Sequence, residues 1–398
     1  MYWKLGEYKK AEQPLLQAIR IYQQHHGDEH LDTLRTEFII GWVYEQQGRY
    51  GDMERLWTRI LAIEQRVSPV QAQLNTMNGL AMAYYRLGKY EEAESLFHKI
   101  LQTVLREVGE ENVPRLPFWK SNLATVYTAQ GRYEEAEQLF VQVQASLERE
   151  EDQRLAELAN LYREQGRYDE AESLLDKKLE AMRQDRGNEH FHTVVCMYDL
   201  VRLYVTQDRY EEAQTLFSEV LPIAHRRMRS DHPVTLRLVN ARAVLHTKLQ
   251  QYDQAKTLFN KAWKGRLREF DDDHPDTLET KNDLAMLYRE QGQYDKAENL
   301  LIEALNKRQT TLGEDHPHTL ISVQELAVLY KEQGDYDKAE PLLLETVNGR
   351  RLKLGDTHPH TLESWNHLIE LYEVWDKPEK AGQWRAKLAR RDDAEEWE

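Results

Sequence analysis

Residues 292–301 read GQYDKAENLL and residues 334–343 read GDYDKAEPLL, so the same box of sequence returns after 42 residues. The tyrosine of this box recurs along the whole chain, and a tenth copy carries Pro378 in its place. The tyrosines are Tyr8, Tyr50, Tyr90, Tyr133, Tyr168, Tyr210, Tyr252, Tyr294 and Tyr336. Self-similarity at such a period indicates a stack of one supersecondary unit. A stack of this kind makes a binding surface the first functional hypothesis and an enzyme the second.

One unit, residues 273–315, shows two helical patterns in succession. Its first half places Leu278, Leu284, Leu287 and Tyr288 on one helical face. Its second half does the same with Ala297, Leu300, Leu301, Ala304 and Leu305. Each unit is therefore predicted to be a hairpin of two helices, here named helix A and helix B, and no strand is expected.

The ends of these helices carry their own signals. Asp273 is predicted to cap the start of helix A, and Pro275 suits its first turn, where a missing N–H costs nothing. Gly292 and Gly313 are predicted to end the two helices at positions of positive φ.

A small residue recurs early in helix B. It is Ala297 in the unit above and Ala93, Ala136, Ala171, Ala213, Ala255 and Ala339 in the other units. Alanine is the smallest side chain that favours a helix, so these sites are predicted to let two helix axes approach closely.

The motifs of the units resemble those of tetratricopeptide repeats. The L-A-x-x-Y part is present at residues 284–288 and 326–330, and the A-x-x-x-F part at residues 93–97 and 213–217. The 42-residue period, with LGEDHPHTL at residues 312–320 between units, is similar to the subclass found in kinesin light chains. The same subclass resembles the repeat arms of NLR-like (STAND) nucleotide-binding switch ATPases.

The resemblance implies an all-α fold, a right-handed superhelical solenoid of stacked antiparallel helix pairs. We expect a single solenoid over residues 1–398, with about nine complete repeats and a truncated first one. Its expected parts are an N-terminal sub-array (1–150), a short repeat that forms a joint (151–185), regular 42-residue repeats (186–376) and a C-terminal capping helix (377–398).

Two departures from the repeat carry predictions. The step from Tyr133 to Tyr168 is only 35 residues, so a shortened helix B is expected there. In the seventh repeat Arg242 stands where other units have leucine, and His246 where they have tyrosine, so that unit is predicted to pack less well.

Composition excludes several classes of function. The 398 residues carry a net charge of −16, which argues against a nucleic-acid or anionic-membrane surface. No apolar run approaches the roughly 20 residues of a membrane span. Cys196 is the single cysteine, so no internal disulfide is possible, and a cytoplasmic setting and a packing role for its side chain are expected.

Catalytic and metal motifs are absent from the sequence. It holds no phosphate loop, no G-x-G-x-x-G after a strand and no H-E-x-x-H. Most of its 15 histidines recur in the His-Pro loops between units, which is typical of a structural turn residue rather than a metal ligand. We therefore expect no enzyme activity, no cofactor and no metal.

The resemblance implies that partners bind along the concave face, which helix A lines. Positions i, i+3, i+7 and i+10 of helix A share that face. The candidate binding residues chosen from them are Trp42, Asn78, Tyr85, Arg202, Asn240, Glu279, Asn282, Arg289, Lys331 and Asn366. The asparagines share one register, and an amide can both donate to and accept from an extended peptide backbone. The early half of the face is aromatic and the late half carries mixed charge, which predicts two modes of contact.

Two functions remain open from the sequence. The first is a non-catalytic scaffold or adaptor for protein partners or peptides, of which kinesin cargo binding is a special case. The second is the ligand-sensing arm of a larger NLR-like (STAND) switch ATPase. Tyr2 aligns with Tyr288, two-thirds of the way along a helix A, so we expect further structure upstream of Met1 in the natural protein.

Overall fold

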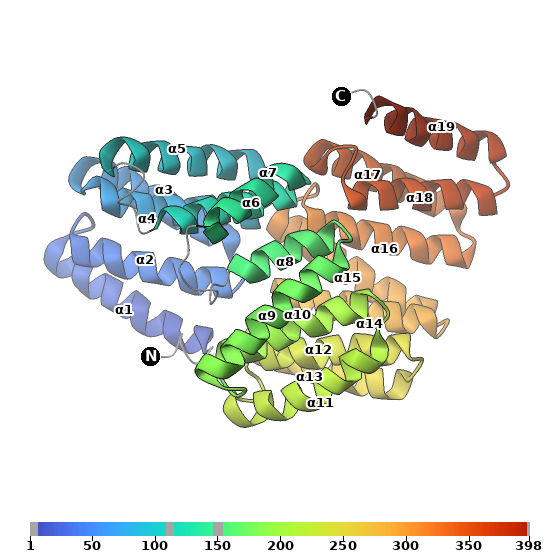
Figure 1. Cartoon of the computed structure of the whole chain (residues 1–398), viewed down its shortest axis with the longest axis horizontal. Helices are drawn as coiled ribbons and strands as arrows, with labels where there is room; N and C mark the ends of the chain where they lie inside the picture. Colours follow the sequence, from blue (N-terminus) through green and yellow to red (C-terminus); the bar gives the residue numbers. More distant parts are fainter. Residues whose placement is uncertain (1–6, 109–114, 146–153, 396–398) are drawn as a thin grey trace. The chain divides into compact units, whose positions relative to one another are not determined.

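The computed structural model describes residues 7–108, 115–145 and 154–395, and these residues form 19 helices and no strands (Figure 1). The B helices are α1 (Tyr8–His26), α3 (Tyr50–Val67), α5 (Tyr90–Val108), α7 (Tyr133–Ala145), α9 (Tyr168–Arg186), α11 (Tyr210–Arg227), α13 (Tyr252–Glu269), α15 (Tyr294–Leu312), α17 (Tyr336–Leu354) and α19 (Pro378–Glu395). The A helices are α2 (Leu31–Gln46), α4 (Val70–Arg86), α6 (Leu116–Ala129), α8 (Arg154–Glu164), α10 (Phe191–Thr206), α12 (Pro233–Lys248), α14 (Pro275–Glu290), α16 (Pro317–Gln333) and α18 (Pro359–Val374). Every B helix begins at the box position, so the predicted hairpin architecture is confirmed.

The chain divides into two compact units, residues 1–280 (unit 1) and 281–398 (unit 2). Consecutive helices pack on one another from α1 to α13 in unit 1 and from α15 to α19 in unit 2. The short repeat lies inside unit 1, where α7 packs on α8. Part of its connection, residues 146–153, is outside the described residues, so the joint over residues 151–185 stays a prediction.

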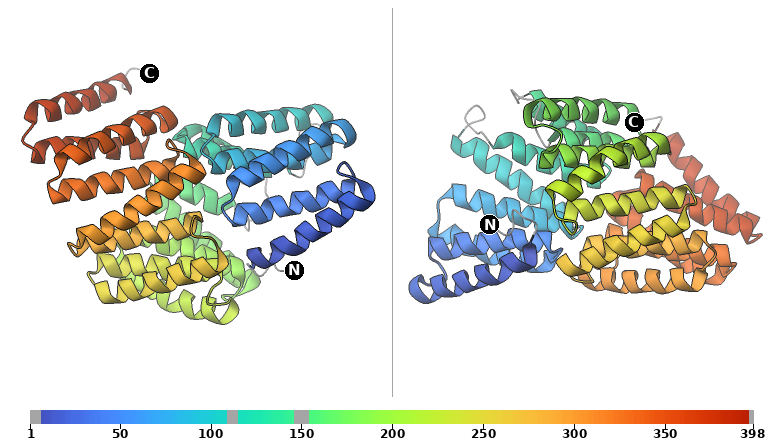
Figure 2. Two further views of the ribbon diagram at one scale, coloured as in Figure 1. Left: turned by 180° about the vertical axis from the view of Figure 1, so that it is seen from behind. Right: turned by 90° about the horizontal axis from the view of Figure 1, so that it is seen from below.

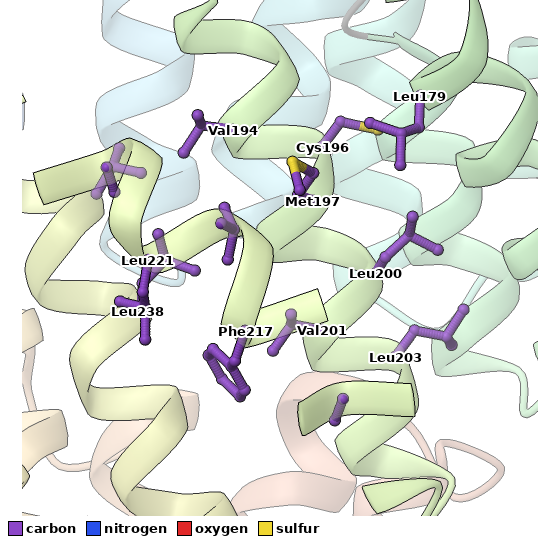
Figure 3. Close-up of a cluster of buried hydrophobic side chains, with 14 of the residues drawn as sticks. Leu179, Val194, Cys196, Met197, Leu200, Val201, Leu203, Phe217, Leu221 and Leu238 are labelled. Carbon is purple, nitrogen blue, oxygen red and sulfur yellow. The ribbon is translucent and has the colours of Figure 1, made fainter. Parts of the chain in front are cut away.

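The core of each unit is a ribbon of side chains between successive helices. Figure 3 shows one stretch of it, where Cys196 and Leu200 of α10 lie among Leu179 of α9 and Phe217 of α11. The Cys196 side chain is fully buried, which confirms its packing role. The seven recurrent alanines of helix B are fully buried as well, so they do mark the close helix contacts.

Histidines, not aspartates, cap six of the A helices. The Nδ1 atom accepts a hydrogen bond from the backbone N–H two residues later at His30, His190, His232, His274, His316 and His358. The predicted cap Asp273 is therefore wrong, because α14 begins at Pro275 and the residue directly before it is His274. Burial lowers the pKa of His274 to about 4, in keeping with a ring nitrogen that must stay unprotonated to accept. The glycine turns are as expected, with φ of +68° at Gly292 and +97° at Gly313.

A buried arginine ties helix B to the next helix A in three successive repeats. Arg266, Arg308 and Arg350 are at most 4% exposed. The Nη1 atom of Arg308 donates to the backbone oxygen of His318 at 3.0 Å and to Ser322 Oγ at 2.7 Å. Arg350 repeats both bonds one period later, to His360 and Ser364. Each guanidinium thus donates hydrogen bonds to polar groups in the first turns of the following helix. Apolar side chains could not satisfy these groups.

The poorer packing expected of the seventh repeat stays a prediction. Arg242 and His246 of α12 line a pocket together with Gln214, Phe217 and Ser218 of α11 and Leu245 of α12.

Candidate functional site

The A helices lie closer to one another than the B helices do. Successive A helices contact each other from α2 to α12 in unit 1, and α16 contacts α18 in unit 2. Among the described helices, no two successive B helices contact as extensively. A stack curves toward the layer whose members are closer, so the A helices line the inner side. We name this surface the helix-A face.

The predicted asparagines lie between neighbouring A helices. Asn78, Asn240 and Asn282 are 4%, 5% and 6% exposed. Asn122 Nδ2 donates to Asn78 Oδ1 at 2.8 Å, and Asn282 Nδ2 approaches Ser322 Oγ at 3.3 Å. The amides of Asn78 and Asn282 already join adjacent helices, so their role as clamps for a partner backbone stays a prediction that would require exchange of these bonds.

The aromatic end of the face comes from α2 and α4. Trp42 is half-buried, and its ring packs edge to face with the fully buried Trp57 ring, with 5.1 Å between the ring centres. Two glycines make room for that buried ring, because a Cβ on Gly41 or Gly79 would lie 2.6 or 2.8 Å from its atoms. Tyr85 is also half-buried, and burial raises the pKa of its hydroxyl. The face therefore presents rigid aromatic edges that are only partly covered.

A charged patch follows on α10, α12 and the start of α14. Arg202 is exposed, and its guanidinium lies 5.8 Å from the centre of the Tyr198 ring. Burial raises the pKa of Tyr198, the charge of Glu279 adds to this, and the charges of Arg202 and Arg237 oppose it. Arg237 pairs with Asp276 at 3.0 Å. These groups meet in a partly dehydrated surface, where a charge acts more strongly than in open water.

The candidates of unit 2 are engaged in ion pairs. Arg289 pairs with Glu325 at 3.0 Å, and Lys331 with Glu370 at 2.8 Å. Burial raises the pKa of the Glu325 carboxyl, although the Arg289 charge opposes that shift. Asn366 is exposed. The late part of the face thus has the mixed charge that the sequence predicts, and its cations already hold carboxylates.

One inner-face residue was missed by the sequence reasoning. Carrying the helix-A register through the short repeat places Arg163 at the i+10 position of α8. Burial lowers the pKa of its guanidinium, and the charge of Arg202 lowers it further, so the two arginines face the same space. The shared register was the signal that could have identified it.

The described residues show no cluster of metal ligands. No three of their His, Cys, Asp or Glu side chains come together as metal ligands would. Burial raises the pKa of the Cys196 thiol to about 12, which leaves it a poor nucleophile. Among the helices described, none has both the length and the apolar character that crossing a bilayer demands.

Comparison with known proteins adds a family match. The model of the tetratricopeptide repeat family matches residues 1–63, 72–149, 152–225, 234–310 and 280–352, which is most of the chain. No curated protein sequence matches the chain.

Three solved structures represent the similar folds. A Podosopora anserina protein described as a kinesin light chain with nearly identical repeats is 27% identical, with a TM-score of 0.41, over 50% of this chain and 93% of its own. A Pyrococcus horikoshii signal-transduction ATPase with a tetratricopeptide repeat sensor is 15% identical, with a TM-score of 0.48, over 84% of this chain and 52% of its own. The Cut9–Hcn1 assembly is 15% identical, with a TM-score of 0.50, over 90% of this chain and 59% of its own.

Proposed function

Since the chain belongs to the tetratricopeptide repeat family, we propose that it is a non-catalytic scaffold that binds segments of protein partners along its helix-A face. Its 42-residue period also resembles that of kinesin light chains. The proposal also places the protein in the cytoplasm, which is supported by a single, buried cysteine.

The observation that carries the proposal is the composition of the helix-A face in unit 1. Trp42, Tyr85 and Tyr198 are half-buried there, and Arg202 is exposed beside the Tyr198 ring. Aromatic and arginine side chains supply most hot spots of protein interfaces, because they bury much area and keep a polar end. Half-buried rings are already ordered by their own helices, so a partner loses little entropy in using them.

Unit 2 supports a different contribution. Its cations are held in ion pairs, with Arg289 on Glu325 and Lys331 on Glu370. A partner that binds there has to replace Glu325 and Glu370 with its own carboxylates. This requirement favours selectivity over affinity. We therefore propose that anchoring occurs on unit 1 and discrimination on unit 2.

Selection of peptides tests the proposal without a known partner. Peptides from a displayed random library would be selected on the full chain, and their affinities measured by titration. Arg202→Glu should weaken binding at least about tenfold, which corresponds to about 1.4 kcal/mol. The matched control is Arg268→Glu on the B helix α13, also exposed, which should leave affinity unchanged. Equal effects of the two substitutions would refute a binding role for the helix-A face.

A further inference from the structure

The first turn of α1 touches the segment between α13 and α14, more than 200 residues later in the same unit. Lys9 Nζ donates to the backbone oxygen of Phe270 at 3.0 Å and pairs with Asp271 at 2.9 Å. The Tyr8 ring stacks on the Phe270 ring at 6.4 Å, and Phe270 stacks on His274 at 3.8 Å. In Figure 2 the start of α1 (dark blue) lies beside this yellow-to-orange segment.

A shared arginine joins the same two regions. Arg229, in the loop before α12, forms ion pairs with Glu7 and with Glu269, the latter at 2.6 Å. The side chains of Glu7 and Glu269 are only 12% and 13% exposed. Arg229 itself is 39% exposed, so the two pairs lie at the edge of the contact, with their carboxylates on the covered side.

The turn after α2 forms the third part of the contact. His274 Nε2 lies 3.1 Å from the backbone oxygen of Gln46, and its Nδ1 accepts the N–H of Asp276, so the Nε2–H donates. Gly48 has φ of +69°, and a Cβ there would overlap Cδ of Pro275. The two backbones therefore approach as closely as the absence of a side chain on Gly48 allows.

We propose that these contacts form a latch that closes unit 1, with Glu7, Lys9 and Gly48 on one side and Arg229, Phe270 and Pro275 on the other. A solenoid repeat ordinarily contacts only its neighbours, so a contact across several intervening repeats is an additional constraint on the stack. The surroundings of Tyr50, at the start of α3, agree with closure. Burial raises the pKa of its hydroxyl, the charge of Asp276 on α14 raises it further, and the charge of Arg237 on α12 lowers it.

Closure of unit 1 limits access to its helix-A face. With the latch engaged the ends of the unit are joined, so a folded partner has to open it to reach the face. The latch itself follows from the contacts alone, and only this gating role rests on the proposed function.

A distance between two spin labels tests the latch in the full chain. Labels at Gln13→Cys on α1 and Lys264→Cys on α13, both exposed positions, would be placed in a Cys196→Ala background and measured by double electron–electron resonance. We expect one narrow distance distribution. Gly48→Ala should add a population at longer distance, because its methyl group meets Pro275.

Gly166→Ala is the matched control, because Gly166 has φ of +74° and open space around its Cβ position. Both substitutions place a methyl group at a glycine of positive φ, but only Gly48→Ala brings that methyl group against a residue of the latch. Glu7→Lys is a second probe, which places a second positive charge against Arg229 directly before α1 and should also lengthen the distance. The latch is overturned if Gly48→Ala and Glu7→Lys both give the distribution of Gly166→Ala. Loss of peptide affinity in Arg202→Glu reports on the binding face and does not depend on this outcome.

Discussion

Replacement of Arg350 by methionine should destabilise unit 2 by about 1–3 kcal/mol. Arg350 is 2% exposed, and its Nη1 donates to Gln324 Oε1 at 2.8 Å, to the His360 backbone oxygen at 2.7 Å and to Ser364 Oγ at 2.8 Å. Methionine keeps most of the apolar stem but removes these donated bonds, and the Ser364 hydroxyl, which lies 2.9 Å from Gln324 Oε1 and 3.0 Å from the His360 oxygen, can replace one of them. One unsatisfied buried group costs about 1–3 kcal/mol.

The neighbouring arginine provides the control. Arg351 pairs with Asp356, and both side chains are more than 40% exposed. A surface pair contributes about 0–1 kcal/mol, so Arg351→Met should change little. Urea unfolding followed by circular dichroism gives the overall difference, and hydrogen exchange of α17 and α18 shows whether it is local. Equal free energies of unfolding for the two variants would refute the role given to the buried arginine.

Three other outcomes test the packing and the caps. Ala297→Arg should lower the melting temperature, because the site is fully buried and overpacking costs about 1–3 kcal/mol or more; an unchanged melt would contradict the close helix contact. Gly79→Ala should destabilise unit 1, because its Cβ would lie 2.8 Å from the Trp57 ring, whereas Gly51→Ala has open space and should be neutral or slightly stabilising in the same urea titration. Burial lowers the pKa of His358 to about 3, below its value of about 6.5 in the unfolded chain, so its contribution to stability is complete above pH about 6.5 and is lost as the pH falls toward 3. His358→Asn, which can cap without titrating, should reduce the fall in unfolding free energy between pH about 7.5 and 5.5, and an unchanged fall would show that the cap does not titrate.

The repeat predicted the helices well because one local rule applies at every unit. The box residue begins each B helix, from Tyr8 to Pro378. The caps were less predictable. Asp273 and His274 are adjacent and both can accept a hydrogen bond, and only the structure shows that α14 begins at Pro275 and that the His274 ring makes the cap bond.

The buried arginines could not be recognised from hydrophobic periodicity. That pattern treats Arg308 as a surface residue, yet it is 4% exposed because its guanidinium finds acceptors in the next helix. Recurrence of arginine at 42-residue steps, opposite a serine or threonine, was the available signal.

The sequence predicts which residues share the helix-A face but not how exposed their side chains are. Arg202 is exposed as expected, whereas Asn282 lies buried against the next A helix. How far a side chain is covered depends on the distance between neighbouring A helices, which no single repeat encodes. The latch could not be predicted from the sequence for the same reason. Lys9 meets Asp271 only because of the accumulated rotation of the intervening repeats.

The central claim is that partners bind on the helix-A face of unit 1. The most direct test is a photo-crosslinking amino acid placed at Tyr198 on α10, and at the exposed Thr257 of α13 as the control, in the full chain within its own cells. Our account predicts a discrete partner adduct from position 198 that disappears with Arg202→Glu, and none from position 257. Adducts from position 257 alone, or adducts from position 198 that survive Arg202→Glu, would contradict it.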